Sequence, residues 1–120
     1  MKTLGWARVK PPGAYMLRRG AWYPVVVDNR YHLVVLGVAQ RNVAVPRERL
    51  QIRQHLPSRF SVVSRMPDEF NPVRGTAADL GVMYAVCPSS RSRVRLAGHP
   101  ERIQCPVCGH REEVAWDDMC

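Results

Sequence analysis

The sequence has 120 residues, which suffices for one modest domain or for two very small ones. Hydrophobic residues make up 46% of it, so the chain has enough apolar side chains to fold. No stretch approaches the roughly 20 apolar residues of a membrane-spanning helix, and the first ten residues lack the apolar core of a signal peptide. We therefore expect a cytoplasmic protein without a membrane partner, in which clustered cysteines bind metal rather than form disulfides.

The formal net charge is +8, and it is unevenly distributed. All 18 basic residues lie at or before Arg111, whereas Glu112, Glu113, Asp117 and Asp118 follow with no basic partner. Sixteen of the 18 are Arg, whose guanidinium group binds phosphate through two nitrogens at once and stacks on bases. A basic body with an acidic C-terminal edge indicates one face for a polyanion.

Residues 1–56 are predicted to form short β-strands separated by turns. Runs of β-branched and aromatic residues favour strands, and Asp28 and Asn29 tolerate the backbone angles of a tight turn. The expected strands are 6–9, 22–27, 31–38, 43–45 and 50–53, with a long loop at 10–20 and one helical turn at 46–49.

This pattern of five strands, a long first loop and a helical turn before the last strand resembles an SH3-like barrel. The segment Val45-Pro46-Arg47-Glu48-Arg49-Leu50 is similar to the end of that fold, where a Val-Pro step precedes the final strand. Peptide-binding SH3 domains carry an Ala-Leu-Tyr-Asp-Tyr motif and a tandem Trp, and neither occurs here. The resemblance therefore implies a Tudor-like or ribosomal-protein-like barrel rather than polyproline recognition.

Residues 57–83 are expected to connect this barrel to a second module. Residues 60–63 are compatible with an extra strand. Thr76 would cap a helical turn at 76–80, and Gly81 would end it.

The second module, 84–120, is predicted from its cysteines. Cys105-Pro106-Val107-Cys108-Gly109 has the form of a knuckle, a turn that directs two thiolates at one metal ion. Eighteen residues earlier, Cys87-Pro88-Ser89-Ser90 has the same form, except that Ser90 replaces the second Cys. The motifs and their separation resemble a zinc ribbon with one degenerate knuckle. We expect a hairpin between the knuckles, from 91–96 to 101–104, and a third strand at 113–116. The fold class is thus mostly β.

Three zinc ligands are in place in this pattern: Cys87, Cys105 and Cys108. Ser is a poor fourth ligand because its hydroxyl keeps its proton at neutral pH. The best protein candidate is His110, which follows Cys108 closely, and Cys120 or a water are alternatives. A site without metal, held by packing alone, also stays open.

We do not expect an enzyme. The chain has no Gly-rich phosphate loop and no Gly-x-Ser-x-Gly elbow, His32 and His55 are isolated, and Asp68 and Glu69 are too close in sequence to flank a substrate. A redox Cys-x-x-Cys should open a helix, whereas Gly109 and a strand-like tail follow Cys108. We therefore expect neither a catalytic residue nor a small-molecule substrate.

A basic surface is the remaining expectation. Arg91, Arg93 and Arg95 alternate with Ser92, Val94 and Leu96, so a strand would place the three Arg in one row and the apolar residues in the core. Other candidates for contact with nucleic acid lie in the barrel and its long loop: Arg41, Arg47, Arg49, Arg53, Arg18 and Arg19. At least two of the nearby aromatics Trp22, Tyr23 and Tyr31 are expected in the core.

Both resemblances imply a binding protein of the translation or transcription machinery. We expect a small basic protein that contacts nucleic acid, DNA or RNA, or a ribonucleoprotein complex. The alternative is an adaptor, an accessory subunit of a larger protein complex, in which the Arg residues meet acidic protein surfaces.

Overall fold

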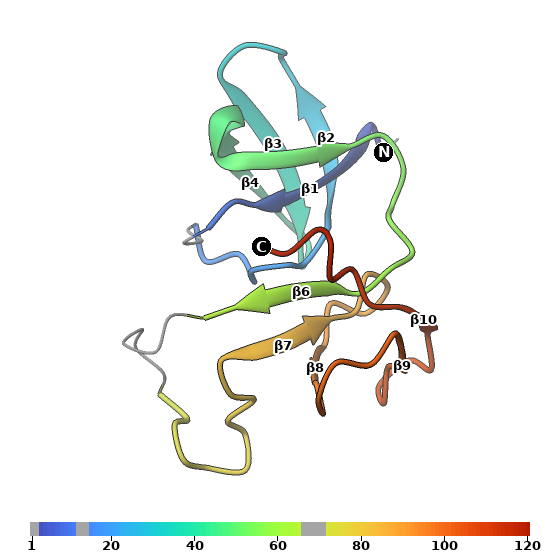
Figure 1. Cartoon of the computed structure of the whole chain (residues 1–120). Coiled ribbons are helices and arrows are strands. Elements are labelled where there is room, and N and C mark those ends of the chain that lie inside the picture. The colour runs from blue at the N-terminus through green and yellow to red at the C-terminus, as the bar shows by residue number, and fades with distance from the viewer. Residues whose placement is uncertain (1–2, 12–14, 66–71) are drawn as a thin grey trace. The chain divides into compact units, whose positions relative to one another are not determined.

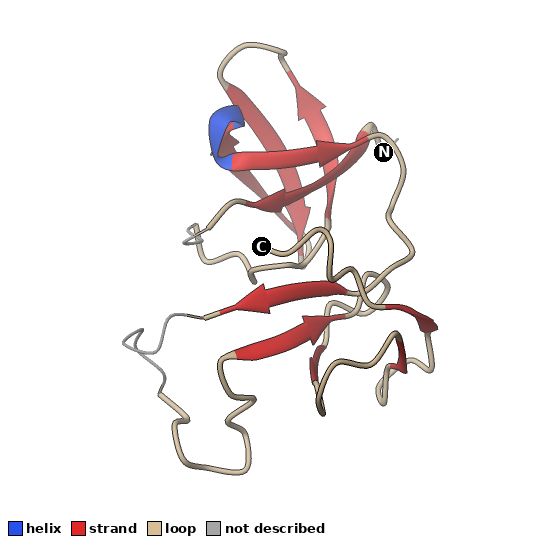
Figure 2. Ribbon diagram, viewed as in Figure 1, coloured by secondary structure: helices blue, strands red, loops and turns tan. Residues whose placement is uncertain are grey.

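The computed structural model describes residues 3–11, 15–65 and 72–120, which fall into two compact units, Met1–Pro57 and Ser58–Cys120 (Figure 1). Strands make up nearly all of the regular structure, as Figure 2 shows, so the mostly β class is confirmed. Residues 12–14 of the expected loop, and Asp68 and Glu69, lie outside the described residues. Among the described residues no helix is long and apolar enough to cross a membrane.

The first unit is a five-stranded antiparallel sheet with the strand order β4-β3-β2-β1-β5. The expected five strands and the helical turn before the last of them are confirmed, with shifts of one or two residues at most ends. The elements are β1 (Gly5–Val9), β2 (Tyr23–Asp28), β3 (Leu33–Val38), β4 (Arg41–Pro46), the 3-10 turn η1 (Arg47–Arg49) and β5 (Leu50–Arg53). The last strand lies beside the first, so the two ends of the unit are joined by pairing.

Alternation along the strands builds the core of this unit. Val34 and Leu36 of β3 are fully buried, and so are Ala7 and Val9 of β1, because residues two apart share a face of a sheet. As expected, two of the three aromatics are in the core. Trp22 and Tyr23 are buried, whereas the side chain of Tyr31 is 80% exposed.

The β2–β3 turn forms as its sequence predicts. Asp28 Oδ1 accepts a hydrogen bond from the Arg30 backbone N–H at 2.8 Å, and Asn29 Oδ1 accepts one from the Tyr31 N–H at 2.9 Å. Arg30 has a φ of 67°, the left-handed conformation that such side-chain bonds help to hold. Because the turn uses Tyr31 and His32, β3 begins at Leu33 rather than at residue 31.

Gly5 is expected to be the least replaceable glycine of this sheet. A Cβ at position 5 would lie 2.9 Å from the backbone carbonyl oxygen of Arg53 on β5, so Gly5→Ala forces two paired strands apart. We expect urea denaturation to show a loss of about 1–3 kcal/mol. Gly37→Ala is the matched control, because its Cβ would meet side chains and no backbone atom: Pro24 at 3.4 Å and Val26 at 3.6 Å. Equal stability of the two variants would contradict the expectation.

The second unit contains two small antiparallel sheets. In the first, β7 (Met83–Val86) lies between β6 (Ser61–Ser64) and β8 (Arg93–Arg95). The second pairs β9 (Arg102–Gln104) with β10 (Arg111–Glu113). The strand expected at 60–63 is therefore present as β6, and it belongs to the sheet of the second unit rather than to a separate connector.

The last residues of the chain cover the outer edge of β6. Phe60 exchanges backbone hydrogen bonds with Glu113 and Ala115, each at 2.9 Å. Farther along, the Cys120 N–H donates to Val62 O, and the Ser64 N–H donates to Cys120 O. This cover satisfies backbone groups that an edge strand would otherwise leave unpaired.

Two expectations for the second unit are wrong. The hairpin from 91–96 to 101–104 does not form, because β8 pairs with β7 and β9 pairs with β10. The strand expected at 113–116 is shifted toward the N-terminus, since β10 spans Arg111–Glu113. Residues 76–80 form one hydrogen-bonded turn but no helix: the Asp79 N–H donates to Thr76 O at 3.0 Å, and the Ala78 N–H donates to Thr76 Oγ at 3.3 Å. The Asp79 carboxylate accepts backbone N–H bonds from Gly75 and Gly81, each at 2.9 Å, which hold this turn locally.

Candidate metal centre and basic surface

Three cysteine thiols lie together in the second unit. The Sγ atoms of Cys87, Cys105 and Cys108 are all within 4.8 Å of one another, and those of Cys87 and Cys108 are 3.6 Å apart. Cys87 and Cys105 are buried and Cys108 is exposed. The structure thus brings together the three residues that the sequence predicts as ligands, and their spacing is short enough for one metal ion.

Each knuckle closes its own hairpin by the same two backbone hydrogen bonds. In the first, the Cys87 N–H donates to Ser92 O and the Arg91 N–H donates to Cys87 O, both at 2.9 Å. In the second, the Cys105 N–H donates to His110 O at 2.8 Å, and the Gly109 N–H donates to Cys105 O at 2.9 Å. The two knuckles are therefore equivalent in backbone hydrogen bonding, residue by residue.

The backbone angles agree with this equivalence. Arg91 and Gly109, each four residues after the first Cys of its knuckle, have positive φ angles of 61° and 80°. Glycine adopts this conformation at little cost, whereas Arg91 must be held in it by the surrounding hydrogen bonds. Ser90 consequently takes the same place in the first knuckle that Cys108 takes in the second.

The Ser90 side chain borders the thiol cluster. Its Oγ is 3.5 Å from Cys105 Sγ and donates a hydrogen bond to Ser92 Oγ at 3.0 Å. The Ser90 backbone N–H donates to Cys87 Sγ at 3.5 Å. Bonds of this kind from a knuckle backbone favour a negatively charged sulfur.

The two buried thiols differ in acidity. Burial raises the pKa of Cys87, against the hydrogen bonds that it accepts from Ser90. Burial also acts to raise the pKa of Cys105, but bonds from the Ser90 side chain and from the backbone N–H groups of Cys108 and Val107 outweigh it and lower that pKa to about 7. Of these two thiols, Cys105 is therefore the one that more readily acts as a thiolate near neutral pH.

The two thiols are also part of the hydrophobic core of this unit. Cys87 and Cys105 pack in one buried cluster with Phe60, Ala85 and Val94. A unit of this size has a small core, and domains below about 70 residues usually need a metal, disulfides or a partner for stability. All four cysteines carry free thiols, so no disulfide supports the unit.

The other candidate ligands lie elsewhere. The His110 ring places Nε2 2.7 Å from the carbonyl oxygen of Ser58 and packs against Phe60, and His110 does not belong to the group of thiols within 4.8 Å. Cys120 donates its S–H to Val62 O at the edge of β6. His99 stacks on Trp116 with 3.7 Å between ring centroids. Among the described residues, the group that could hold a metal ion therefore consists of the three cysteines alone.

The expected row of three Arg is shorter than predicted. Arg93 and Arg95 are exposed on one face of β8, while Val94 between them is buried in the core, as the alternation requires. Arg91 is not in the row, because it lies in the first knuckle with a positive φ and β8 begins only at Arg93. The alternating pattern holds for the strand but not for the turn before it.

Both strand Arg side chains are held by neighbours. The Arg93 guanidinium lies over the Tyr84 ring, 5.7 Å from its centroid, and Arg95 Nη2 donates to the carbonyl oxygen of Asp79 at 2.7 Å. Arg65, which no motif of the sequence marks as a candidate, also lies over Tyr84, with its guanidinium 5.6 Å from the ring centroid. Arg65 lies two residues after the buried Val63, so the alternation of a strand places both on one side of the chain, and this spacing could have indicated its position near Tyr84.

The Arg candidates of the first unit fall into different settings. Arg47 pairs with Asp28 at 3.0 Å, so its charge is partly neutralised. The Arg53 guanidinium lies 5.8 Å from the centroid of Trp22. The other four are half-buried or exposed: Arg18, Arg19, Arg41 and Arg49.

A buried Arg that the sequence analysis does not single out lies in the same unit. Arg8 is 1% exposed, donates from Nε to Gln51 Oε1 at 2.6 Å and lies 4.7 Å from the centroid of Trp22. Arg8 lies on β1 between the buried residues Ala7 and Val9, and this position was the only sign that its side chain would be buried.

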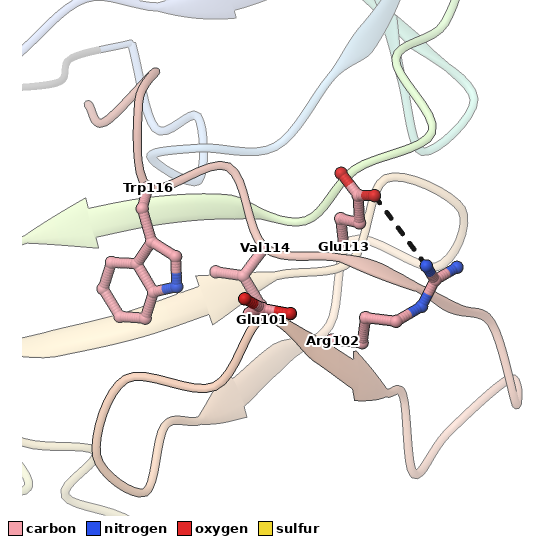
Figure 3. Close-up of a pocket in the computed structure, with 5 residues that line it drawn as sticks. All are labelled: Glu101, Arg102, Glu113, Val114 and Trp116. Carbon is pink, nitrogen blue, oxygen red and sulfur yellow. Dashed lines mark ion pairs between the residues drawn. The ribbon is translucent and has the colours of Figure 1, made fainter.

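A cavity of about 320 Å³ lies beside the acidic residues of the second unit, lined by Glu101, Arg102, Glu113, Val114 and Trp116 (Figure 3). Arg102 pairs with Glu113 at 3.8 Å and with Glu112 at 3.4 Å. This side of β9 and β10 therefore carries carboxylates whose charge opposes polyanion binding.

No protein-family model, no curated protein and no solved structure matches the chain.

Proposed function

We propose that the protein is a small, non-enzymatic nucleic-acid-binding protein, built as an SH3-like barrel followed by a zinc-ribbon-like module. The strand order β4-β3-β2-β1-β5, with a 3-10 turn before β5, supports the barrel. Two hairpins, each closed by a cysteine knuckle, support the ribbon. The observation that carries the function is the exposed pair Arg93 and Arg95 on a strand whose intervening residue is fixed in the core.

Zinc is the metal that fits this donor set best. Cysteine thiolates are soft ligands that favour zinc over calcium or magnesium, and paired knuckles are its usual structural setting. Because Cys87 and Cys105 belong to the core, the metal would stabilise the fold of the second unit rather than act on a substrate. Zinc analysis of purified protein should give one ion per chain. If the metal-free protein unfolds at the same temperature as the zinc-bound protein, this part of the proposal is rejected.

Nucleic acid is the partner that fits the charge distribution. The net charge of +8 resides mostly in Arg, which binds phosphate and stacks on bases. Arg93 and Arg95 are presented on a strand, and each unit exposes further Arg side chains. In the second unit, most of the described acidic residues lie just before β9, on β10 and in the segment after β10, whereas β8 carries Arg93 and Arg95.

Fluorescence anisotropy with single-stranded RNA, duplex RNA and duplex DNA, each titrated with salt, tests this proposal. Micromolar or tighter binding that weakens steeply with salt supports it, because phosphate contacts release counterions. An absence of binding to all three at ~100 mM salt rejects nucleic acid as the partner. The ranking of the three probes assigns DNA or RNA.

Tyr31 gives a second, independent measure of the same proposal. Its ring is 80% exposed beside Arg30, so a base can stack on it without any rearrangement of the core. We expect Tyr31→Ala to weaken binding to single-stranded RNA by on the order of 10-fold or more, since one stacked base contributes about 1–3 kcal/mol. Anisotropy measures the change. Tyr31→Phe is the control and should bind like the wild type, because it keeps the ring. An equal loss of affinity in both variants, or no loss in either, would exclude stacking on Tyr31.

An adaptor role has one observation in its favour. A cavity of about 220 Å³ in the first unit is lined by Tyr31, Leu33 and Pro46 with His32 and Glu48, and the side chains of Tyr31 and Leu33 are 80% and 45% exposed. Such a surface suits an apolar side chain of a partner protein. A stoichiometric complex that survives nuclease treatment would favour the adaptor, and a complex lost on nuclease treatment would favour nucleic acid.

A further inference from the structure

We propose that Ser90 occupies the fourth corner of the thiol cluster, and that a metal bound there exchanges with solution instead of staying permanently bound. The proposal rests on the zinc binding proposed above and concerns the one position where the two knuckles differ. It attributes the looser hold on the metal to a serine at the position where the other knuckle has a cysteine.

The corner assignment follows from the matched knuckles. Cys87 corresponds to Cys105 in backbone hydrogen bonding, and Arg91 corresponds to Gly109 in both hydrogen bonding and φ, so Ser90 corresponds to Cys108. Its side chain also points the right way, since Ser90 Oγ lies 3.5 Å from Cys105 Sγ. A thiol at this position would complete the four cysteines of a structural zinc site.

The hydroxyl makes this corner weak for a chemical reason. A serine hydroxyl keeps its proton at neutral pH and offers a neutral oxygen, whereas cysteine offers a charged and softer sulfur. Ser90 Oγ is also engaged in a hydrogen bond to Ser92 Oγ at 3.0 Å. A site with three protein ligands keeps an open position, through which competing ligands can reach the metal.

Nothing else among the described residues fills that corner. His110 and Cys120 are bonded to Ser58 and Val62 respectively, outside the thiol group. Solvent can reach the corner, because Cys108 is exposed and Ser90 is only half-buried. The site is therefore closed on its core side by Cys87 and Cys105 and accessible on its outer side.

The test compares Ser90→Cys with Ser89→Cys in the full chain. Both add one thiol to the same knuckle, but Ser89 corresponds to Val107, whose side chain is 70% exposed in the other knuckle. We expect Ser90→Cys to bind zinc at least ~10-fold more tightly and to release it to a chelator at least ~10-fold more slowly, because changes merely around the ligands already alter metal affinity by roughly 10–100-fold. Ser89→Cys should stay within about 3-fold of the wild type.

Cobalt(II) substitution supplies a readout of the ligands themselves. The sulfur-to-cobalt charge-transfer absorption should grow by about a third in Ser90→Cys, which has four thiolates in place of three, and stay unchanged in Ser89→Cys. Equal release rates and equal cobalt spectra for wild type and Ser90→Cys would overturn the proposal.

The same experiment separates this inference from zinc binding itself. If the wild type binds no zinc and Ser90→Cys binds one ion, the corner assignment is upheld and zinc binding by the natural chain is rejected. If the wild type binds zinc and Ser90→Cys behaves identically, zinc binding is upheld and the corner assignment is rejected. If no variant binds zinc or cobalt, both are rejected.

Discussion

Cys105→Ser is expected to abolish metal binding and to unfold the second unit. The change leaves two thiolates in a site that has three, and it places a hydroxyl within the buried cluster of Phe60, Ala85, Cys87 and Val94. Zinc bound by four ligands contributes about 10–16 kcal/mol to small zinc domains. Losing half of that would exceed the roughly 3–5 kcal/mol that the hydrophobic core of so small a unit supplies. We expect zinc affinity to fall at least ~100-fold.

Zinc titration and thermal unfolding by circular dichroism measure these two effects. Cys120→Ser is the matched control: it makes the same substitution at a buried site of the same unit, away from the thiol cluster. Cys120 donates its S–H to Val62 O, a bond that a serine hydroxyl can also make. The control should keep wild-type zinc binding. Wild-type zinc content and stability in Cys105→Ser would show that the cluster does not organise the unit around a metal.

The first unit was the more predictable half of the chain. Its strands are local runs of β-branched and aromatic residues, and its turns use residues with specific backbone preferences, such as Asp28 and Asn29 at the β2–β3 turn. Neighbouring strands along the chain pair with each other, so the order β1 to β4 follows from sequence. The pairing of β5 with β1 followed only from the resemblance to a barrel.

Strand pairing in the second unit was less predictable. Residues 91–96 and 101–104 are adjacent strand-like segments, and adjacent segments usually pair. The knuckles override this tendency, because each one is itself a hairpin turn that pairs the strand before it with the strand after it. The sequence shows the motif, but the direction in which the flanking strands leave it depends on backbone hydrogen bonds.

For the candidate site, the sequence predicts the three cysteines because their spacing is set by the knuckle itself. The fourth ligand was not predictable in this way. His110 is close to Cys108 in sequence, but its ring bonds to Ser58, a contact between residues 52 positions apart. Arg91 was misplaced for a related reason: a period of two applies only inside a strand, and Arg91 belongs to the turn.

Replacing Arg93 and Arg95 together by Ala is expected to weaken nucleic-acid binding by on the order of 10-fold at ~100 mM salt. Both guanidinium groups extend from the same exposed face of β8, so they can contact neighbouring phosphates. Each lost phosphate contact should also lower the slope of log affinity against log salt by about 1, hence by about 2 for the pair. Salt-titrated anisotropy gives both quantities.

Two controls separate loss of contact from loss of charge or of fold. Arg102→Ala with Arg111→Ala removes the same charge from β9 and β10, beside Glu112 and Glu113, and should leave the salt slope unchanged. Lys at positions 93 and 95 keeps the charge and should retain most of the binding. The Ala pair also loses the contact of Arg93 with Tyr84, worth about 0.5–1 kcal/mol, which is too little to unfold the unit. If both Ala pairs weaken binding equally, the attraction is a property of net charge and β8 is not the interface.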